Sequence, residues 1–139
     1  MPQVQETFSA APRNVSAARR FVADTLAQWD ADAFEWAAIT AVSELTTNAV
    51  LHARTGFTLS LRLEDDLLRL EVTDHSALLP RLRNHTEQAS TGRGMSVVYA
   101  LAAAHGVVAT AAGKTVWCEV RANAESYAAI SAATAPSWI

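Results

Sequence analysis

The chain has a single cysteine, a single lysine and a slight excess of acidic residues. Its single cysteine, Cys118, permits no intrachain disulfide, and the setting TVWCEV predicts a strand in which the thiol serves as a small apolar residue. Lys114 is the only lysine among 11 basic residues, the net charge is -3, and no segment concentrates arginine. We therefore expect neither nucleic acid nor an anionic membrane as a partner.

The sequence also lacks a long hydrophobic run. Residues 1–21 have no apolar core of the kind that a signal peptide needs, and no stretch reaches the length that crosses a bilayer. We therefore expect a cytoplasmic protein. The histidines are scattered, which argues against a zinc site, and GKT at 113–115 is no P-loop because the required earlier glycine falls at Val108.

The hydrophobic pattern of the 139 residues predicts one globular domain over 1–139. Apolar residues at helical spacing predict helices at about 12–28, 32–53 and 95–104, and a tail or weak helix over 122–139. Alternating patterns predict strands at 3–10, 57–63, 68–72, 107–112 and 115–121, the last two joined by a turn at Gly113 and Lys114. Because each hairpin strand has one polar face, we expect an α+β fold: a two-layer sandwich whose mixed, mostly antiparallel sheet carries its helices on one face.

The predicted helix over 32–53 carries two polar side chains inside an apolar stretch, SELTTNAV. Glu44 and Asn48 lie one helical turn apart and share a face opposite the apolar stripe. This face is either exposed to solvent or binds a ligand. An asparagine oxygen suits Mg²⁺, and a glutamate one turn away can accept a proton from a nucleophile aligned on a phosphate.

Asp74 ends the strand LRLEVTD in phase with the apolar residues of that strand, so its carboxylate is predicted to point toward the buried side. A buried carboxylate without a hydrogen-bond donor is costly. The donor is either local, as in a cap or turn, or belongs to a ligand, and an adenine amino group is one that would suit.

The segment after Asp74 loses all periodicity from His75 to Thr91, which is typical of a functional loop or lid. It ends in TGRGM, where Gly92 and Gly94 precede a predicted helix. Paired glycines there let the backbone approach a ligand, and the amides at a helix start attract phosphate. On its own, such a turn is more often an ordinary loop.

The order of these features resembles the GHKL superfamily, the histidine-kinase-like ATPases, over about residues 10–121. ELTTN is similar to the superfamily's ExxxN box. The resemblance implies a histidine-kinase-like ATPase fold that binds ATP with Mg²⁺. It also implies that Asn48 holds the Mg²⁺, that Glu44 is the catalytic base, and that Asp74 binds the adenine.

Three further segments of the sequence bear on this resemblance. TGRGM is similar to the second glycine box, which implies that Gly92, Arg93 and Gly94 lie near the phosphates. GKTVWCEV is similar to the closing segment, whose threonine, here Thr115, assists adenine binding. The superfamily's first glycine box reads DxGxG, whereas this sequence reads DHSAL and lacks both glycines.

Within the superfamily, the shortness of the chain favours a resemblance to the anti-sigma-factor serine kinases. These bind a sigma factor and phosphorylate a serine of a small antagonist protein. Because an uncovered sheet edge needs protection, we also expect a homodimer through the N-terminal strand and the exposed sheet face, and the resemblance points the same way. Two functions stay open. Glu44 and Asn48 favour a serine/threonine kinase, whereas DHSAL favours a module of the same fold that has lost catalysis and acts by contact alone.

Overall fold

A computed structural model describes residues 2–76 and 95–123 of the protein. Its elements follow the order β1 (Gln3–Phe8), α1 (Arg13–Gln28), η1 (Asp32–Phe34), α2 (Glu35–Asn48), η2 (Ala49–Ala53), β2 (Phe57–Glu64), β3 (Leu67–Asp74), α3 (Met95–Leu101), β4 (Ala104–Thr110) and β5 (Gly113–Arg121). The predicted helix or tail over 122–139 and most of the predicted lid lie outside the described residues.

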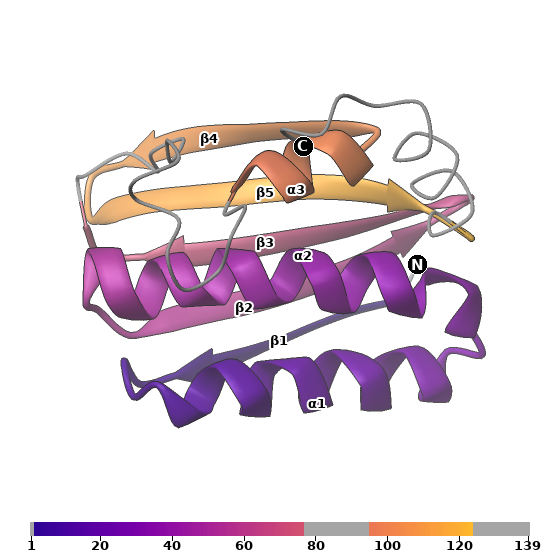
Figure 1. The fold of residues 1–139 in the computed structure, drawn as a ribbon, viewed down its shortest axis with the longest axis horizontal. Helices are drawn as coiled ribbons and strands as arrows, with labels where there is room; N and C mark the ends of the chain where they lie inside the picture. The colour runs from indigo at the N-terminus through magenta and orange to yellow at the C-terminus, as the bar shows by residue number, and fades with distance from the viewer. Residues whose placement is uncertain (1, 77–94, 124–139) are drawn as a thin grey trace, which may run out of the picture.

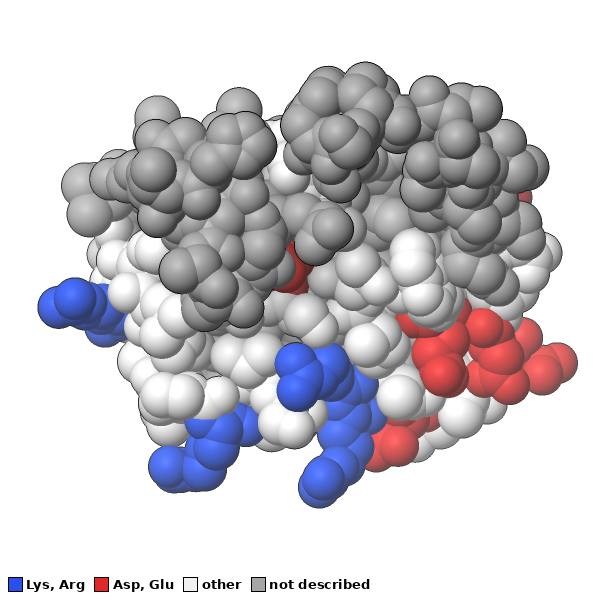
Figure 2. All heavy atoms as spheres, in the orientation of Figure 1, with Lys and Arg blue, Asp and Glu red and all other residues white. Residues whose placement is uncertain are grey.

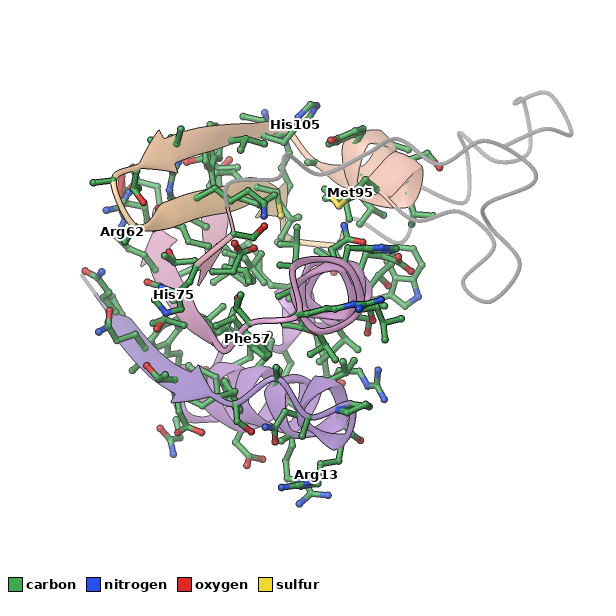
Figure 3. The ribbon with its side chains drawn as sticks, turned by 90° about the vertical axis from the view of Figure 1, so that its left-hand side faces the viewer. Arg13, Phe57, Arg62, His75, Met95 and His105 are labelled. Carbon is green, nitrogen blue, oxygen red and sulfur yellow. The ribbon has the colours of Figure 1, made fainter. Side chains whose placement is uncertain are left out.

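The strands form one five-stranded sheet in the order β1-β2-β3-β5-β4. Every pairing in it is antiparallel, where a mixed, mostly antiparallel sheet was predicted. Figure 1 shows α1, α2 and α3 in front of the sheet, and the side view in Figure 3 places all of them on the same side of it. The predicted α+β fold with helices on one sheet face is confirmed.

The core lies between the sheet and the helices, because alternate side chains of each central strand point that way. In β2 and β3 these are Leu59, Leu61, Leu68, Leu70 and Val72, all of them buried. The Cys118 thiol of β5 is buried among them, and this burial raises its pKa to about 12. The thiol is therefore protonated at neutral pH and behaves as the small apolar residue that the sequence predicted.

The sheet face without helices is polar. The Arg69 guanidinium lies 4.0 Å from the ring centroid of Trp117 and donates hydrogen bonds to Glu71 at 2.6 Å and Glu119 at 3.1 Å. Among the described residues, no helix covers this face.

The predicted helix over 32–53 is helical throughout but changes its hydrogen-bonding pattern twice. It begins as a 3₁₀ turn, continues as α2 and ends as the π-helix η2. Arg54 then ends it with a left-handed backbone (φ 59°), and its amide donates to the Ala49 carbonyl at 2.8 Å. The wide π turn directly follows Asn48, and such turns are frequent at functional sites.

The prediction of a helix over 95–104 is wrong at the C-terminal end. α3 stops at Leu101, and the amide of Ala103 already donates to the Glu119 carbonyl of β5 at 2.8 Å. Pairing with a buried strand outweighs the helix propensity of alanine here. β4 therefore starts earlier than predicted, and its turn into β5 falls at residues 111–112 rather than at Gly113 and Lys114.

Candidate functional site

Asp74, one of the predicted site residues, lies at one end of the molecule, where β3 ends. Phe57, Asp74 and Lys114 are direct neighbours across β2, β3 and β5. This is the left-hand end in Figure 1, where α2 and η2 also terminate, and Figure 3 views the molecule from there. The His75 amide donates to Thr55 Oγ1 at 3.2 Å, which ties the end of β3 to the segment that follows η2.

Asp74 is buried, as the strand pattern predicted, and its hydrogen-bond donor is a residue of the chain itself. Lys114 Nζ donates to Asp74 Oδ1 at 3.0 Å and to Oδ2 at 2.9 Å. The exposed fractions of the two side chains are only 6% for Lys114 and 4% for Asp74. The Ser76 amide donates to Oδ1 at 2.9 Å.

Sequence reasoning missed Lys114, although a signal for it was available. Lys114 alternates in phase with Val116, Cys118 and Val120, whose side chains are buried on the helix side of β5. A lysine in that register must carry its charge toward the core and therefore requires a buried anion.

Gly113 allows the close approach of β5 to β3 that this ion pair uses. A Cβ at position 113 would collide with the Asp74 carbonyl oxygen and would lie 2.7 Å from the His75 Cα. Only glycine fits between these backbones, so the residue before Lys114 is fixed by packing.

Thr115 lies on the other face of the sheet. Its Oγ1 is 2.8 Å from Thr73 Oγ1, and both residues are out of phase with Asp74 and Lys114. The structure therefore places Thr115 on the sheet face opposite to Asp74, and a role of Thr115 in adenine binding stays a prediction.

Glu44 and Asn48 share one flank of α2, and both are half-buried rather than fully exposed. Ser43, one residue earlier, accepts a hydrogen bond from Arg19 of α1 at 3.4 Å and thus marks the α1 side of the helix. Since successive residues turn by about 100°, Glu44 and Asn48 lie on the flank away from this contact. α3 is the next helix on that side in Figure 1.

The sequence matches the family described as "Histidine kinase-like ATPase domain" over residues 8–120. The chain belongs to this family. The matched range is close to residues 10–121, over which the sequence resembles the GHKL superfamily. The predicted membership of this superfamily is therefore confirmed. No curated protein matches the chain.

Part of the crystal structure of the RsbU and RsbW domains of Rv1364c from Mycobacterium tuberculosis has the same fold as this ATPase domain. The TM-score is 0.67 and the sequence identity 22%, with 88% of this chain and 32% of that chain covered. At this identity the likeness establishes the fold alone. The chain thus corresponds to about a third of that protein's length.

The predicted second glycine box precedes α3 in the sequence. Gly92, Arg93 and Gly94 lie outside the described residues, and α3 begins at Met95, directly after them in the sequence. Among the helices of residues 2–76 and 95–123, none is long and apolar enough to span a membrane.

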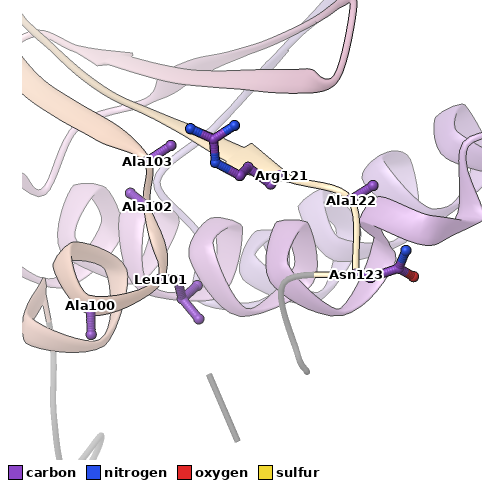
Figure 4. A pocket seen from close by; sticks show the side chains of 7 residues that line it. All are labelled: Ala100, Leu101, Ala102, Ala103, Arg121, Ala122 and Asn123. Carbon is purple, nitrogen blue, oxygen red and sulfur yellow. The ribbon is translucent and has the colours of Figure 1, made fainter. Parts of the chain in front are cut away.

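Figure 4 shows a pocket of about 390 Å³. It lies where β5 ends at Arg121, whereas Asp74 pairs with Lys114 at the start of that strand. Its lining is mostly small and apolar: Ala100, Leu101, Ala102, Ala103, Arg121, Ala122 and Asn123. The only charged side chain in this lining, Arg121, lies 3.6 Å from Asp66. Among the described residues of this lining there is no carboxylate or histidine.

The two halves of the candidate site differ in how they suit Mg-ATP. Glu44 and Asn48 fit the phosphate half, because a neutral oxygen ligand and a carboxylate base lie one turn apart on a half-buried flank. Asp74 does not fit the base half as it stands, because its carboxylate already accepts three hydrogen bonds from the chain.

Proposed function

We propose that this ATPase domain is an anti-sigma regulatory factor that works by partner switching in the cytoplasm. Residues 1–139 act as a single domain that binds a sigma factor and, as a serine/threonine kinase, phosphorylates a serine of an antagonist protein. The family match and the fold support the regulatory theme. The kinase activity rests on one observation, the pairing of Glu44 and Asn48 on one flank of α2.

The proposed chemistry is divided between these two side chains. When bound, Mg-ATP supplies the phosphoryl group and the metal that neutralises its charge. The Asn48 side-chain oxygen would hold the metal. The Glu44 carboxylate would accept the proton of the antagonist's serine hydroxyl as that oxygen bonds to the γ-phosphorus and ADP leaves. Half-burial of Glu44 limits competing water around the proton that it takes up.

Replacing Asn48 by alanine tests the metal role. The parent is expected to bind ATP more tightly with Mg²⁺ than without it. Asn48→Ala should weaken Mg-ATP binding roughly tenfold or more, because the side-chain oxygen that binds the metal is lost. Metal-free ATP binding should change little, because the lost contact is to the metal. Calorimetric titration in Mg²⁺ and in a chelator measures both.

The matched control for Asn48→Ala is Thr40→Ala, two turns earlier on the same helix, whose hydroxyl donates within the helix to the Trp36 carbonyl at 2.8 Å. Equal losses of ATP binding with and without metal would contradict the Mg²⁺ role of Asn48. A parent that binds no nucleotide would contradict the kinase proposal itself.

The uncovered sheet face and the β1 edge support homodimerisation. β1 is an edge strand of the sheet, and the face carries Trp117 and Arg69 without a covering layer among the described residues. We expect sedimentation at tens of micromolar to give a dimer. Monomers alone at that concentration would contradict this interface.

The helix face suits a protein partner with complementary charge. α1 carries Arg13, Arg19 and Arg20 toward its start, and Asp30 and Asp32 follow its end. Figure 2 shows basic side chains along the lower part of this face and acidic ones gathered at its right-hand end. Separated charges of this kind orient a docking protein and speed its encounter.

A second candidate function is favoured by the ion pair at Asp74. A module that acts by contact alone needs no base-binding carboxylate, and here the carboxylate is held by Lys114 instead. In that case partner binding persists without ATP, and no phosphoserine appears on any partner protein.

A further inference from the structure

The Asp74 carboxylate has little hydrogen-bonding capacity left for a ligand. A carboxylate offers about four lone-pair sites. Lys114 Nζ takes one on each oxygen, and the Ser76 amide takes a further one on Oδ1. A base amino group that approached this carboxylate would also meet the ammonium protons, which are donors like its own. The two groups therefore compete for the same acceptor.

The ion pair is hard to displace because it is almost dry. Both side chains are at least nine-tenths buried, at exposed fractions of 6% and 4%. A neutral amino group can replace the hydrogen bonds of Lys114 but not its charge, so it would leave a buried carboxylate without a counter-ion. The displaced ammonium would also have to reach water.

We propose that Lys114 is an internal competitor for the adenine amino group and thereby determines nucleotide affinity and base selectivity. This inference rests on the proposed ATP site and deepens it. The fixed register of β5 supports it: Gly113 locks the strand against β3, so Lys114 lies directly opposite Asp74. The Asp74 carboxylate accepts the adenine amino group only in the fraction of molecules in which its ion pair with Lys114 is open.

Removing the ammonium tests the competition directly. Lys114→Met is expected to raise the affinity for ATP by about ten- to a hundredfold, the range that corresponds to a hydrogen bond to a charged acceptor. Inosine triphosphate has the same ribose and phosphates but a carbonyl oxygen in place of the amino group. Its affinity should change less than about twofold. Calorimetry with both nucleotides gives the ratio.

The matched control is Arg121→Met, which removes a cation from the exposed end of the same strand. It should leave the affinities for both nucleotides within about twofold of the parent. If Lys114→Met does not fold, as judged by circular dichroism, Lys114→Gln replaces it, because glutamine keeps a donor toward Asp74 without the charge. A smaller adenine-specific gain is expected from it, because the glutamine amide still donates to Asp74 while the charge is gone.

A second measurement uses the unmodified chain. Because Lys114 is its only lysine, ¹⁵N-lysine labelling gives one side-chain ammonium signal in NMR. Saturating ATP should shift this signal or broaden it by solvent exchange as the ion pair opens. ATP that saturates the protein without changing the signal would overturn the proposal.

The outcomes separate this inference from the proposed function. Tighter ATP binding by the variant than by a parent that also binds supports both. Equal binding by parent and variant overturns the competition and leaves the ATP site standing. Binding by the variant alone supports the competition and contradicts a kinase role for the parent. Failure of both to bind overturns both proposals.

Discussion

Replacing Glu44 by glutamine is expected to lower phosphoryl transfer to a serine-bearing antagonist by about 10²- to 10⁴-fold. Glutamine keeps the size of glutamate and much of its hydrogen bonding, but it accepts no proton at neutral pH. ATP binding should therefore stay within a few-fold of the parent while transfer collapses. A radiolabel transfer assay and calorimetry on the same protein preparations measure the two effects.

The matched control for Glu44→Gln is Glu35→Gln, the same substitution in the first turn of the same helix, where the side chain is exposed. It should transfer phosphate at the parental rate. Transfer by Glu44→Gln as fast as the parent would rule out the general-base role. A parallel loss of ATP binding and transfer would instead assign Glu44 to binding.

The fold was predictable because its strands alternate cleanly. Leu68, Leu70 and Val72 of β3 are buried, and the residues between them face the other side, as a period of two requires. The same alternation predicted a buried Asp74. The burial of this site residue was predictable because the local strand pattern alone decides which face of the sheet its side chain occupies.

The prediction failed where nonlocal pairing decides the structure. Alanines 102–104 favour a helix by propensity, but pairing with β5 draws residue 104 into β4. Lys114 and Thr115 were assigned by a turn pattern and by resemblance. The alternation with Val116 and Cys118 would have put Lys114 inside and Thr115 outside.

The partner of Asp74 illustrates what a single sequence leaves open. The strand pattern showed that a buried carboxylate needs a donor, and both a ligand and a side chain could meet that need. The choice depends on which residue stands opposite Asp74 in β5, and that register is set by contacts 40 residues away. Local periodicity carries no such information.

Breaking the Asp74–Lys114 ion pair is expected to have the largest effect on stability. Removing one partner leaves the other charge buried without a counter-ion, which typically costs about 3–5 kcal/mol of the free energy of unfolding. We expect losses in this range for Asp74→Asn and for Lys114→Met, measured by urea denaturation. Changing both residues should cost less than the sum of the two losses, because neither charge is then left alone.

The exposed ion pair between Arg121 and Asp66 provides the control, since its side chains are 63% and 77% exposed at an N–O distance of 3.6 Å. Asp66→Asn should cost about 0.5 kcal/mol or less, as is usual for surface pairs. If Asp74→Asn costs no more than that, water already screens the Asp74–Lys114 pair. A screened pair would give way easily to an adenine amino group, and the competition that we propose for Lys114 would lose its physical basis.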